Sequence, residues 1–337
     1  QILDDDIVVT VDGSHGDVFQ GVAQTRLDWD AGRRERLASK QAEMASVKTR
    51  TKVMAILAEP EAAAALAKEN VDGIGLLRLE FLLARIGVHP RLYLQEGTEE
   101  EFIDQLVQGI SAFCQPFGDR PVVLRLTDFK TNELQNLEGG SKFEDPEENP
   151  MLGLRGAARY MQQPEVFALE VEAIRRVRET YPNLYAMVPF VRTVAELEWV
   201  LNFLAEHGLE RGPNFKVWMM AEVPSNVILL DKFIAAGLDG VSIGSNDLTQ
   251  LILGIDRDNE KLCEVGNELD PAVLWALEDI VTTARSLGAT VGICGQAPSD
   301  HPRLVQMLVE WGVTSISVSP DRIPHTRELV HAAEQQQ

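Results

Sequence analysis

Cysteine is scarce in this chain of 337 residues, and its pattern excludes two kinds of covalent reinforcement. Cys114, Cys263 and Cys294 are far apart in the sequence, and no two of them form a CxxC pair. A disulfide framework needs an even set of cysteines, and a structural zinc site needs closely spaced ligand pairs. The cysteine pattern therefore favours neither, and it predicts a protein of the reducing cytoplasm.

Basic charge and long apolar runs are also lacking. Lys and Arg total 31 against 52 Asp and Glu, which gives a formal net charge of -21 at pH 7. A chain of that sign is a poor binder of phosphate backbones, so we expect no nucleic-acid partner. No apolar run approaches the roughly 18 residues of a membrane span, so no membrane partner is expected either. The composition, 45% hydrophobic and 25% charged, is that of an ordinary globular protein.

The first 48 residues differ in pattern from the rest. Residues 1–24 contain two short β-prone runs around a cluster of turn-forming residues, which predicts a small β-hairpin. Residues 25–48 are charged and helix-prone, which predicts a helical linker to a larger domain over 49–330. Because the chain starts at Gln1 and not at Met, we expect a fragment or a processed form.

Beyond the linker, short apolar runs alternate with longer amphipathic segments. Eight runs separated by helical patterns predict a closed (β/α)8 TIM barrel, an α/β fold with a parallel sheet. A doubly wound open sheet is the competing fold, but its usual GxGxxG turn is replaced by Ala-Glu-Pro-Glu at 58–61. The predicted strands are Val53–Leu57, Ile74–Leu77, Val122–Leu126, Leu184–Pro189, Val217–Met220, Val241–Ile243, Thr290–Ile293 and Ser315–Val318. The predicted helices include Val166–Thr180, Val194–His207, Asn226–Ala236, Pro271–Leu287 and Pro302–Trp311.

Polar residues stand directly after several of these runs. In a parallel barrel the carboxyl ends of the strands share one mouth, where barrel enzymes build their sites. Any one of these residues also fits a helix cap or a structural ion pair, so it is their convergence that predicts a site. The residues are Arg78, Glu80, Arg125, Asp128, Glu222, Asn246, Asp247 and Cys294.

Two of the carboxylates form a candidate metal site. Glu222 and Asp247 follow successive strands, so we expect them to approach one cation at the mouth. Mg2+ fits this pair because it takes one or two protein carboxylates and fills its octahedron with other oxygens, whereas zinc would recruit His or Cys. The alternative for Asp247 is a helix N-cap, since an apolar helical run follows it. None of the six histidines stands at a strand end, and we interpret them as structural or exposed.

The same mouth is predicted to bind an anion. Gly244, Ser245 and Asn246 form a small-residue loop whose backbone N–H groups suit a phosphate, although a plain turn would use the same residues. Arg78 and Arg125 add planar, permanently charged groups that bind carboxylate or phosphate with two hydrogen bonds. The combination favours an anionic ligand over a plain turn.

Cys294 differs from the other cysteines by its position. It follows a predicted strand and has Gly292 and Gly295 nearby, which leaves room for a ligand atom. Its thiol is predicted to act as an acid or base, with neighbouring cations lowering its pKa. Most cysteines are buried and inert, and we keep that interpretation for Cys114 and Cys263.

Seven stretches resemble the phosphoenolpyruvate synthase family, and they occur in the order of that family. The resemblance spans about residues 50 to 300, and it implies the C-terminal phosphoenolpyruvate/pyruvate-binding barrel of phosphoenolpyruvate-utilising enzymes. Small departures at Leu79, Ala221 and Ala297 remove no charged group. The stretches are GIGLLRLEFLL from Gly73, VVLRLTDFKTNE from Val122, ENPMLGLRGAARY from Glu148, MVPFVRT from Met187, MMAEVPSN from Met219, DGVSIGSNDLTQLILGIDRD from Asp239 and VGICGQAPSDHP from Val291.

The resemblance implies roles for the charged residues of the mouth. Arg78 and Arg125 match arginines that hold the phosphate and carboxylate of the substrate, and Arg155 is a further candidate on the phosphate side. Glu222 and Asp247 match the Mg2+ ligands of the family. The implied cofactor is therefore Mg2+.

The remaining matches concern the substrate itself. By the resemblance, Gly244, Ser245 and Asn246 match the loop that contacts substrate, and Cys294 matches the cysteine that exchanges a proton with C3 of pyruvate. The reaction implied for a full-length enzyme converts ATP, pyruvate and water to AMP, phosphoenolpyruvate and phosphate. This chain is expected to carry only the pyruvate half of that reaction.

The resemblance also implies partners. The family's ATP-grasp domain and swivelling phosphohistidine domain are not recognised here, although residues 1–24 resemble the tail of the swivelling domain and His15 does not match the phosphocarrier. The expected partners are pyruvate or phosphoenolpyruvate, the swivelling domain of a full-length chain and a second copy in a homodimer.

Rival interpretations come from two classes. Pyruvate, phosphate dikinase and enzyme I of the sugar phosphotransferase system share this barrel, but RLTDFKTNE and GICGQAPSD are more similar to the synthase. A catalytically idle binding or dimerisation module is the rival from outside the enzymes.

Overall fold

The computed structural model describes residues 9–12, 17–20, 46–256, 259, 262 and 265–337. The chain divides into a unit of residues 1–47 and a unit of residues 48–337. In the first unit, β1 (Val9–Asp12) pairs antiparallel with β2 (Asp17–Gln20), which confirms the predicted hairpin. Most of the predicted linker lies outside the described residues.

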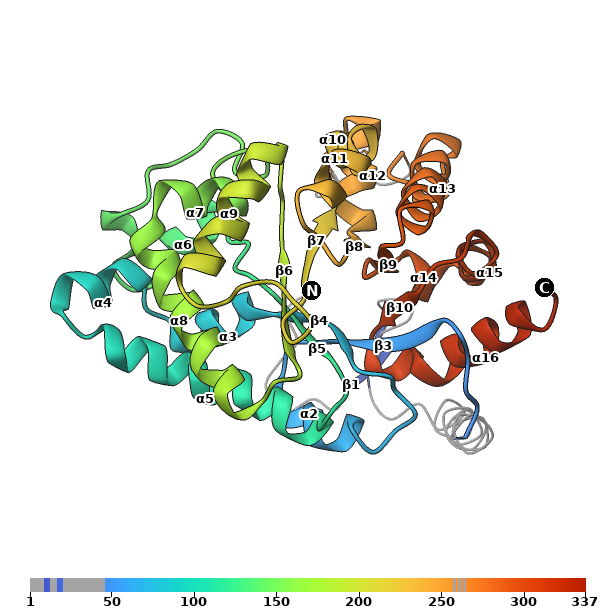
Figure 1. Cartoon of the computed structure of the whole chain (residues 1–337), viewed down its shortest axis with the longest axis horizontal. Coiled ribbons are helices and arrows are strands. Elements are labelled where there is room, and N and C mark those ends of the chain that lie inside the picture. The colour runs from blue at the N-terminus through green and yellow to red at the C-terminus, as the bar shows by residue number, and fades with distance from the viewer. Residues whose placement is uncertain (1–8, 13–16, 21–45, 257–258, 260–261, 263–264) are drawn as a thin grey trace. The chain divides into compact units, whose positions relative to one another are not determined.

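The second unit is a closed barrel of eight parallel strands (Figure 1). Each strand pairs with the next one along the chain, and β10 closes the ring against β3, with Ser315 opposite Lys52. All eight predicted runs form these strands, so the predicted (β/α)8 fold is confirmed. The strands are β3 (Lys52–Leu57), β4 (Ile74–Arg78), β5 (Val122–Arg125), β6 (Leu184–Val188), β7 (Val217–Ala221), β8 (Gly240–Ile243), β9 (Thr290–Ile293) and β10 (Ser315–Val318).

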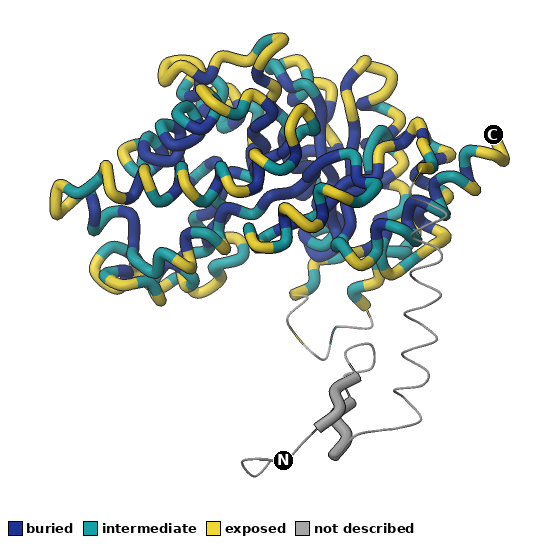
Figure 2. Tube along the Cα trace, turned by 90° about the horizontal axis from the view of Figure 1, so that it is seen from below, coloured by how far each residue is buried: buried dark blue, intermediate teal, exposed yellow. Residues whose placement is uncertain are grey.

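Helices surround the barrel, with buried residues turned inward and exposed residues outward (Figure 2). The pattern follows from apolar residues at helical spacing, as in α8, where Phe167, Val171 and Ile174 are buried. The helices are α2 (Pro60–Leu66), α3 (Leu79–Ile86), α4 (Pro90–Glu96), α5 (Glu99–Phe117), α6 (Thr131–Gln135), α7 (Ala157–Gln162), α8 (Pro164–Thr180), α9 (Val194–Glu206), α10 (Pro224–Ile228), α11 (Leu230–Ala235), α12 (Ser245–Leu253), α13 (Pro271–Ser286), α14 (Ala297–Asp300), α15 (Pro302–Trp311) and α16 (Ile323–Glu334).

One predicted helix is wrong in its extent. The segment Asn226–Ala236 belongs to two short helices, α10 and α11, because Leu229 takes the non-helical values φ -119° and ψ 29°. The break leaves Ile228 77% exposed and returns Leu230 to the core. Apolar spacing alone predicted one continuous helix, since it does not reveal a single residue outside helical geometry.

Side chains fill the barrel in levels between its two ends. The level toward the N-terminal strand ends is only partly filled, which leaves a cavity of about 210 Å³ that we call the lower hollow. Gly75 and Ser317 are among the residues that line it, and they are so close that a Cβ atom on Gly75 would lie 2.0 Å from the hydroxyl oxygen of Ser317. At mid-height, an apolar layer separates the lower hollow from the mouth on one side of the barrel. It consists of Leu76, Val123, Met187 and Met220, with Cys294 at its edge.

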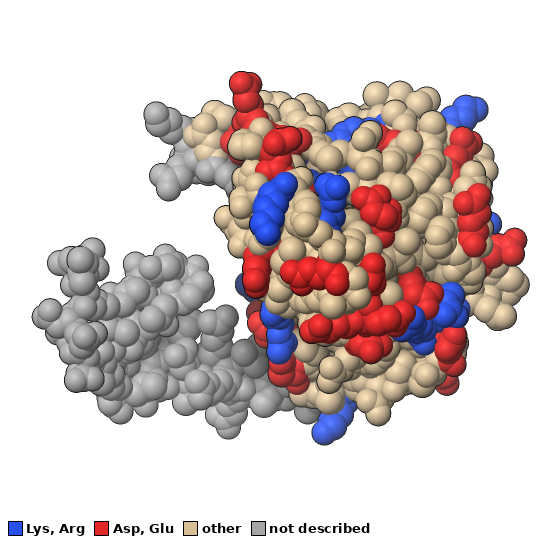
Figure 3. All heavy atoms as spheres, turned by 90° about the vertical axis from the view of Figure 1, so that its left-hand side faces the viewer, with Lys and Arg blue, Asp and Glu red and all other residues tan. Residues whose placement is uncertain are grey.

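The surface reflects the acidic composition. Asp and Glu form much of the charged surface on the face shown in Figure 3, and α5 begins with three consecutive acids, Glu99–Glu101. A potential of this sign repels polyanions and keeps a protein dispersed. None of the described helices is both long and apolar enough to cross a lipid bilayer.

Candidate active site

The C-terminal ends of the strands bring the predicted residues to one mouth. Arg78 and Arg125 are the last residues of β4 and β5, while Glu222 and Cys294 directly follow β7 and β9. The loop after β8 leads into α12, and Asp247 lies in the first turn of that helix. Because all strands are parallel, these side chains converge although they come from five separate strands.

Three carboxylates form a cluster at the centre of the mouth. Asp128, Glu222 and Asp247 each place one oxygen within 4.8 Å of the others. All three residues are buried, at 5%, 1% and 8% exposure. The sequence predicted the second and third as metal ligands, whereas it gave Asp128 only a place at the mouth.

The cluster fits a divalent cation with oxygen ligands. Two oxygens on one Mg2+ lie at most about 4.2 Å apart, because each bond is about 2.1 Å long. The cluster meets this limit with small side-chain adjustments. Arg125 and Arg155 offset part of the buried charge of the three carboxylates. The raised pKa of Glu222 indicates a remaining excess of negative charge, which a divalent ion would relieve.

Glu222 is the most constrained of the three acids. The backbone N–H of Phe190 donates a 2.7 Å hydrogen bond to its Oε1. A Cβ atom on Gly244 would lie 2.5 Å from its Oε2, so the close approach of the β8 loop requires a glycine there. Burial, followed by the charges of Asp247 and Asp128, raises the pKa of Glu222 to about 8. A cation in the cluster would lower that pKa again.

Arg125 is held by two acids, Glu80 in the first turn of α3 and Asp128 in the loop after β5. Its Nη2 lies 3.1 Å from Oε2 of Glu80, and its Nη1 lies 3.4 Å from Oδ2 of Asp128. The backbone N–H of Asp128 donates to Oε1 of Glu80, which joins the loop after β5 to the start of α3. These contacts fix the direction of the guanidinium group before any ligand arrives, which lowers the entropy cost of binding.

Arg155 has carboxylate partners on two sides. Its Nε and Nη2 donate to Asp128 at 2.9 and 2.6 Å, and Nη2 also lies 3.2 Å from Oδ2 of Asp247. The guanidinium group stacks 4.0 Å from the ring centroid of Phe190, and the residue is 4% exposed. The geometry therefore gives Arg155 a structural part in holding the acidic cluster, beside the phosphate role that the resemblance implies.

Two recesses open at the mouth and meet at Arg78 and Phe81, which line both. One, the arginine recess, has a volume of about 480 Å³, and the other, the cysteine recess, about 410 Å³. Both have room for a three-carbon acid with a phosphate group. The arginine recess is lined by residues that include Arg125, Asp128, Lys130, Arg155 and Asp247. The cysteine recess is lined by residues that include Ile56, Cys294, Gln296, Asp300 and Arg322.

Cys294 is buried at the edge of its recess, with 3% exposure. Its thiol donates to the carbonyl oxygen of Ile243 at 3.6 Å. Burial raises the pKa of this thiol to about 11, and the Ser242 hydroxyl and the two arginines Arg125 and Arg78 offset only part of the effect. The expectation of a lowered pKa was therefore wrong, because loss of solvent outweighs the attraction of the cations.

The other cysteines differ from Cys294. Cys114 is fully buried in α5, and burial raises its pKa to about 12. This environment agrees with the prediction of an inert side chain. Cys263 lies outside the described residues.

The loop after β8 is tied to its neighbours by its side chains. Ser245 is fully buried, and its hydroxyl donates to Oε1 of Glu268 at 2.7 Å. Oδ1 of Asn246 accepts a 3.1 Å hydrogen bond from the backbone N–H of Gln296, which links the β8 and β9 loops. Ser245 therefore supports the loop, while its predicted contact with substrate stays a prediction.

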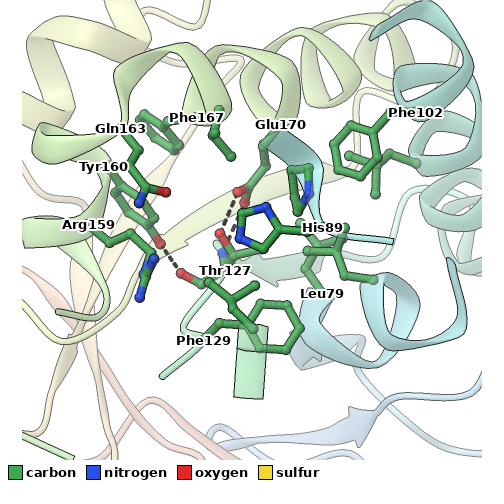
Figure 4. A pocket seen from close by; sticks show the side chains of 15 residues that line it. Leu79, His89, Phe102, Thr127, Phe129, Arg159, Tyr160, Gln163, Phe167 and Glu170 are labelled. Atoms are coloured by element: carbon green, nitrogen blue, oxygen red, sulfur yellow. Dashed lines mark hydrogen bonds between the residues drawn. The ribbon is translucent and has the colours of Figure 1, made fainter. Parts of the chain in front are cut away.

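A further buried acid holds the loop that carries two residues of the mouth (Figure 4). Glu170 of α8 accepts hydrogen bonds from the backbone N–H of Thr127 at 3.0 Å and from its hydroxyl at 2.7 Å. The hydroxyl of Tyr160 donates to the carbonyl oxygen of Thr127 at 2.5 Å. Every polar group of Thr127 is thus satisfied, and the residue lies between Arg125 and Asp128 in the chain.

The sequence analysis missed Glu170, although a signal was present. The residue lies on the same helical face as Phe167, Val171 and Ile174, all of which are buried. An acid within an apolar stripe needs a buried partner, because a charged group is otherwise left without solvent. The partner is a backbone segment distant in sequence, so the stripe could indicate only that one exists.

The burial of Glu170 leads to a prediction about how the stability of the protein depends on pH. Burial raises its pKa to about 8, so the folded protein binds a proton that the unfolded chain releases near pH 4 to 5. This contribution to stability is complete below pH 4 and is lost as the pH rises toward 8. Glu170→Gln keeps the shape of the neutral acid and cannot ionise. Between pH 5 and pH 8.5, we expect the free energy of unfolding of the wild type to fall by about 2–4 kcal/mol more than that of Glu170→Gln.

Urea unfolding at several pH values, followed by circular dichroism, measures this difference. Glu179→Gln is the matched control, because Glu179 is an exposed acid of the same helix. Parallel stability profiles for the wild type and Glu170→Gln would contradict the prediction.

Fold and site together define a (β/α)8 barrel whose mouth combines an acidic cluster with arginine side chains. The family model for the PEP-utilising enzyme, PEP-binding domain, matches residues 32–335, and the chain belongs to this family.

Several curated relatives of this chain are named phosphoenolpyruvate synthase. The chain is 47% identical over 99% of its length to the probable phosphoenolpyruvate synthase of Staphylothermus marinus, of which the match covers 41%. It is 46% identical over 98% of its length to the phosphoenolpyruvate synthase of Aeropyrum pernix, covering 42% of that protein. The enzyme of that name from Escherichia coli is 42% identical over 82% of this chain and 38% of its own length. The chain thus spans about two fifths of the length of these relatives.

Proposed function

We propose that this chain is the substrate-binding barrel of a phosphoenolpyruvate synthase. In this proposal it binds pyruvate or phosphoenolpyruvate with Mg2+ and hosts phosphoryl transfer from a phosphohistidine to the enolate of pyruvate. The full-length enzyme then converts ATP, pyruvate and water to AMP, phosphoenolpyruvate and phosphate, as a phosphotransferase of the cytoplasm. The observation that carries the proposal is the cluster of three buried carboxylates beside the arginine recess.

The acidic cluster is the proposed holder of the metal. Glu222 and Asp247 are its predicted ligands, and Asp128 is placed to act as a third or to orient the site through Arg155. When bound, Mg2+ supplies Lewis acidity that stabilises negative charge on the carboxylate and enolate oxygens of the substrate.

The arginines are the proposed anion binders. Arg78 and Arg125 end adjacent strands, so their guanidinium groups approach one ligand from neighbouring directions. Charge in phosphoryl transfer spreads over the equatorial oxygens, and prealigned guanidinium groups stabilise it without reorganising. The ion pair of Arg125 with Glu80 provides that alignment.

Cys294 is the proposed acid and base at C3 of the substrate. Its raised pKa keeps the thiol protonated at neutral pH, which suits delivery of a proton from Sγ to the methylene carbon of an enolate. In the opposite direction the thiolate accepts a methyl proton of pyruvate. The apolar layer beside the thiol limits access of bulk water to the reacting carbon.

Calorimetry with the 337-residue chain tests the binding part of this proposal. Phosphoenolpyruvate is titrated with and without Mg2+, and we expect binding only when the ion is present. Arg125→Met is expected to weaken binding about 10- to 100-fold, since charge-assisted hydrogen bonds are lost. Arg85→Ala is the matched control, because Arg85 forms an exposed ion pair with Glu61 away from the recesses.

An idle structural module is the alternative that this titration distinguishes. Such a module would give no heat that depends on Mg2+, and equal affinity in Arg125→Met and the wild type would also contradict the proposed role. Assays of a full-length enzyme with and without inorganic phosphate as substrate separate a synthase from a dikinase. The homodimer stays a prediction.

A further inference from the structure

Phe190 has an unusual backbone conformation, two residues after the end of β6. Its φ is +45°, and among the residues that the structure describes it is the one non-glycine residue with a positive φ. A bulky side chain makes this left-handed conformation unfavourable, because its Cβ atom then crowds the backbone. The residue is 1% exposed, so the packing around it holds the strained conformation in place. Strained positions of this kind cluster at functional sites, so the strain predicts a functional reason for this conformation.

The main chain of Phe190 reaches the first acid of the cluster. Its N–H donates the 2.7 Å hydrogen bond to Oε1 of Glu222, and Glu222 is 1% exposed. A hydrogen bond to a carboxylate is strong where no solvent competes for the oxygen. The carbonyl oxygen of Pro189 accepts from the backbone N–H of Ala157, which ties the turn after β6 to the start of α7. This turn therefore sets the direction of the Phe190 N–H and, with it, the position of Glu222.

The ring of Phe190 reaches the other two acids through an arginine. The guanidinium group of Arg155 lies 4.0 Å from the ring centroid, within the range of a cation–π contact. The same guanidinium group donates to Asp128 at 2.9 and 2.6 Å and to Oδ2 of Asp247 at 3.2 Å. Because a planar group that stacks on a ring keeps its plane, the ring limits the directions in which Arg155 offers its N–H groups.

A second arginine holds the segment that carries Arg155. The guanidinium group of Arg192 lies 4.8 Å from the centroid of the Phe190 ring. Its Nη2 donates to the carbonyl oxygen of Gly153 at 2.6 Å, and its Nη1 donates to that of Arg155 at 3.4 Å. Gly156 lets this segment come close, because a Cβ atom there would lie 2.7 Å from the Cβ atom of Phe190. The Phe190 ring and the main chain around Arg155 are thus held against each other.

We propose that Phe190 is a positioning residue of the metal site, which holds Glu222 by its main chain and Arg155 by its ring. The inference rests on the proposed binding of Mg2+ by the acidic cluster. Through these two contacts one residue reaches all three carboxylates, whose oxygens lie within 4.8 Å of one another. Carboxylates held in this way lose little freedom when an ion arrives, so the entropy cost of binding is lower. A residue that only fills the core would have no such effect on affinity.

The experiment measures the Mn2+ affinity of the 337-residue chain by electron paramagnetic resonance. Phe190→Leu keeps an apolar side chain and the backbone N–H, but it removes the ring that contacts Arg155. We expect the Kd for Mn2+ to rise about 10- to 100-fold, as for other lost supporting partners of metal ligands. Phe190→Met fills more of the space of the ring and should give the same result. Phe190→Tyr restores the ring and should restore the affinity.

Phe117→Leu is the matched control. Phe117 is 2% exposed, and its ring lies 4.7 Å from the guanidinium group of Arg120. Both residues precede β5, so they lie at the end of the barrel opposite the mouth. The substitution therefore removes a buried ring from an arginine without touching the acidic cluster, and the Kd for Mn2+ should equal that of the wild type.

A double-mutant cycle with Arg155→Met separates positioning from general packing. Whatever Arg155→Met itself does to Mn2+ affinity, the ring of Phe190 then has no guanidinium group to hold against Asp128 and Asp247. We therefore expect Phe190→Leu to change the Kd far less in the Arg155→Met background than in the wild type. A residue that acts only by packing would have the same effect in both backgrounds.

Wild-type affinity in Phe190→Leu and Phe190→Met would overturn the inference. An equal loss in Phe117→Leu, or an undiminished effect of Phe190→Leu in the Arg155→Met background, would assign the loss to packing and overturn it as well. In each of these cases, loss of Mn2+ binding in Glu222→Gln would still support the acidic cluster as the metal site. If Glu222→Gln bound Mn2+ as the wild type does, the proposed metal site would be rejected, and the inference with it.

Discussion

Replacing Glu222 with Gln should remove divalent-metal binding and, with it, proton exchange on pyruvate. The substitution preserves the size of the side chain and its hydrogen bond from Phe190, but it removes the carboxylate that Glu222 would offer to a cation. We expect Mn2+ affinity to fall by at least about 100-fold, since loss of a mere supporting partner already costs 10- to 100-fold. Deuterium wash-in to pyruvate should fall in proportion.

The control for Glu222→Gln is Glu61→Gln, which removes a charge of the same sign from an exposed ion pair. It should leave both Mn2+ affinity and wash-in unchanged. Asp247→Asn is expected to repeat the Glu222→Gln result, because both acids belong to the cluster. If Glu222→Gln bound Mn2+ as tightly as the wild type, the acidic cluster would not be the metal site.

Asp128→Asn distinguishes two possible roles of Asp128, as a direct metal ligand or as a residue that orients the site through Arg155. As a direct ligand, its loss should weaken Mn2+ binding as strongly as the loss of Glu222. As a partner that orients the site through Arg155, its loss should cost less, within about 10- to 100-fold. Both results are read from the same Mn2+ titration.

Replacing Cys294 with Ala should stop proton exchange and leave binding nearly unchanged. The thiol is the proposed acid and base at C3, and groups of that kind contribute about 100- to 10,000-fold to rate. Its side chain is uncharged at neutral pH, because burial raises its pKa to about 11, so its removal leaves the charge of the mouth unchanged. Wash-in measured by NMR and Mg2+-dependent binding of phosphoenolpyruvate measured by calorimetry should therefore diverge.

Cys114→Ala is the matched control for this divergence. Cys114 is equally buried but lies in α5, where burial raises its pKa to about 12. Its loss should reduce stability through a small cavity and leave wash-in at the wild-type rate. A parallel loss of binding and exchange in Cys294→Ala would show that the thiol acts by packing and not by proton transfer.

Much of the fold could be predicted because barrel strands are short, apolar and regularly spaced. All eight predicted runs became strands, and residues at their ends, such as Arg125 and Glu222, therefore reached the mouth. The prediction of one continuous helix over 226–236 was wrong because Leu229 leaves helical geometry. The apolar spacing gives no sign of this break. Local patterns predict elements well but do not specify where a helix breaks.

The site was predicted less completely, for reasons of distance and dielectric environment. Asp128 joins Glu222 and Asp247 from the segment after β5, where Glu170 and Tyr160 hold the neighbouring residue Thr127 by hydrogen bonds. These partners are distant in sequence, so local patterns did not reveal them. The pKa of Cys294 could not be predicted from its neighbours in sequence. Burial decides that this pKa is raised and not lowered, and burial depends on how the whole barrel packs around the thiol.

By itself, the sequence determined the alternation of strands and helices, and hence that residues after separate strands share one end of a barrel. Only the tertiary structure decided which of those residues touch, how deeply they are buried and which charges they meet. The physical reason is that hydrophobic periodicity is a local property of the chain. Ion pairing, desolvation and the recesses at the mouth arise from segments that meet only when the barrel closes.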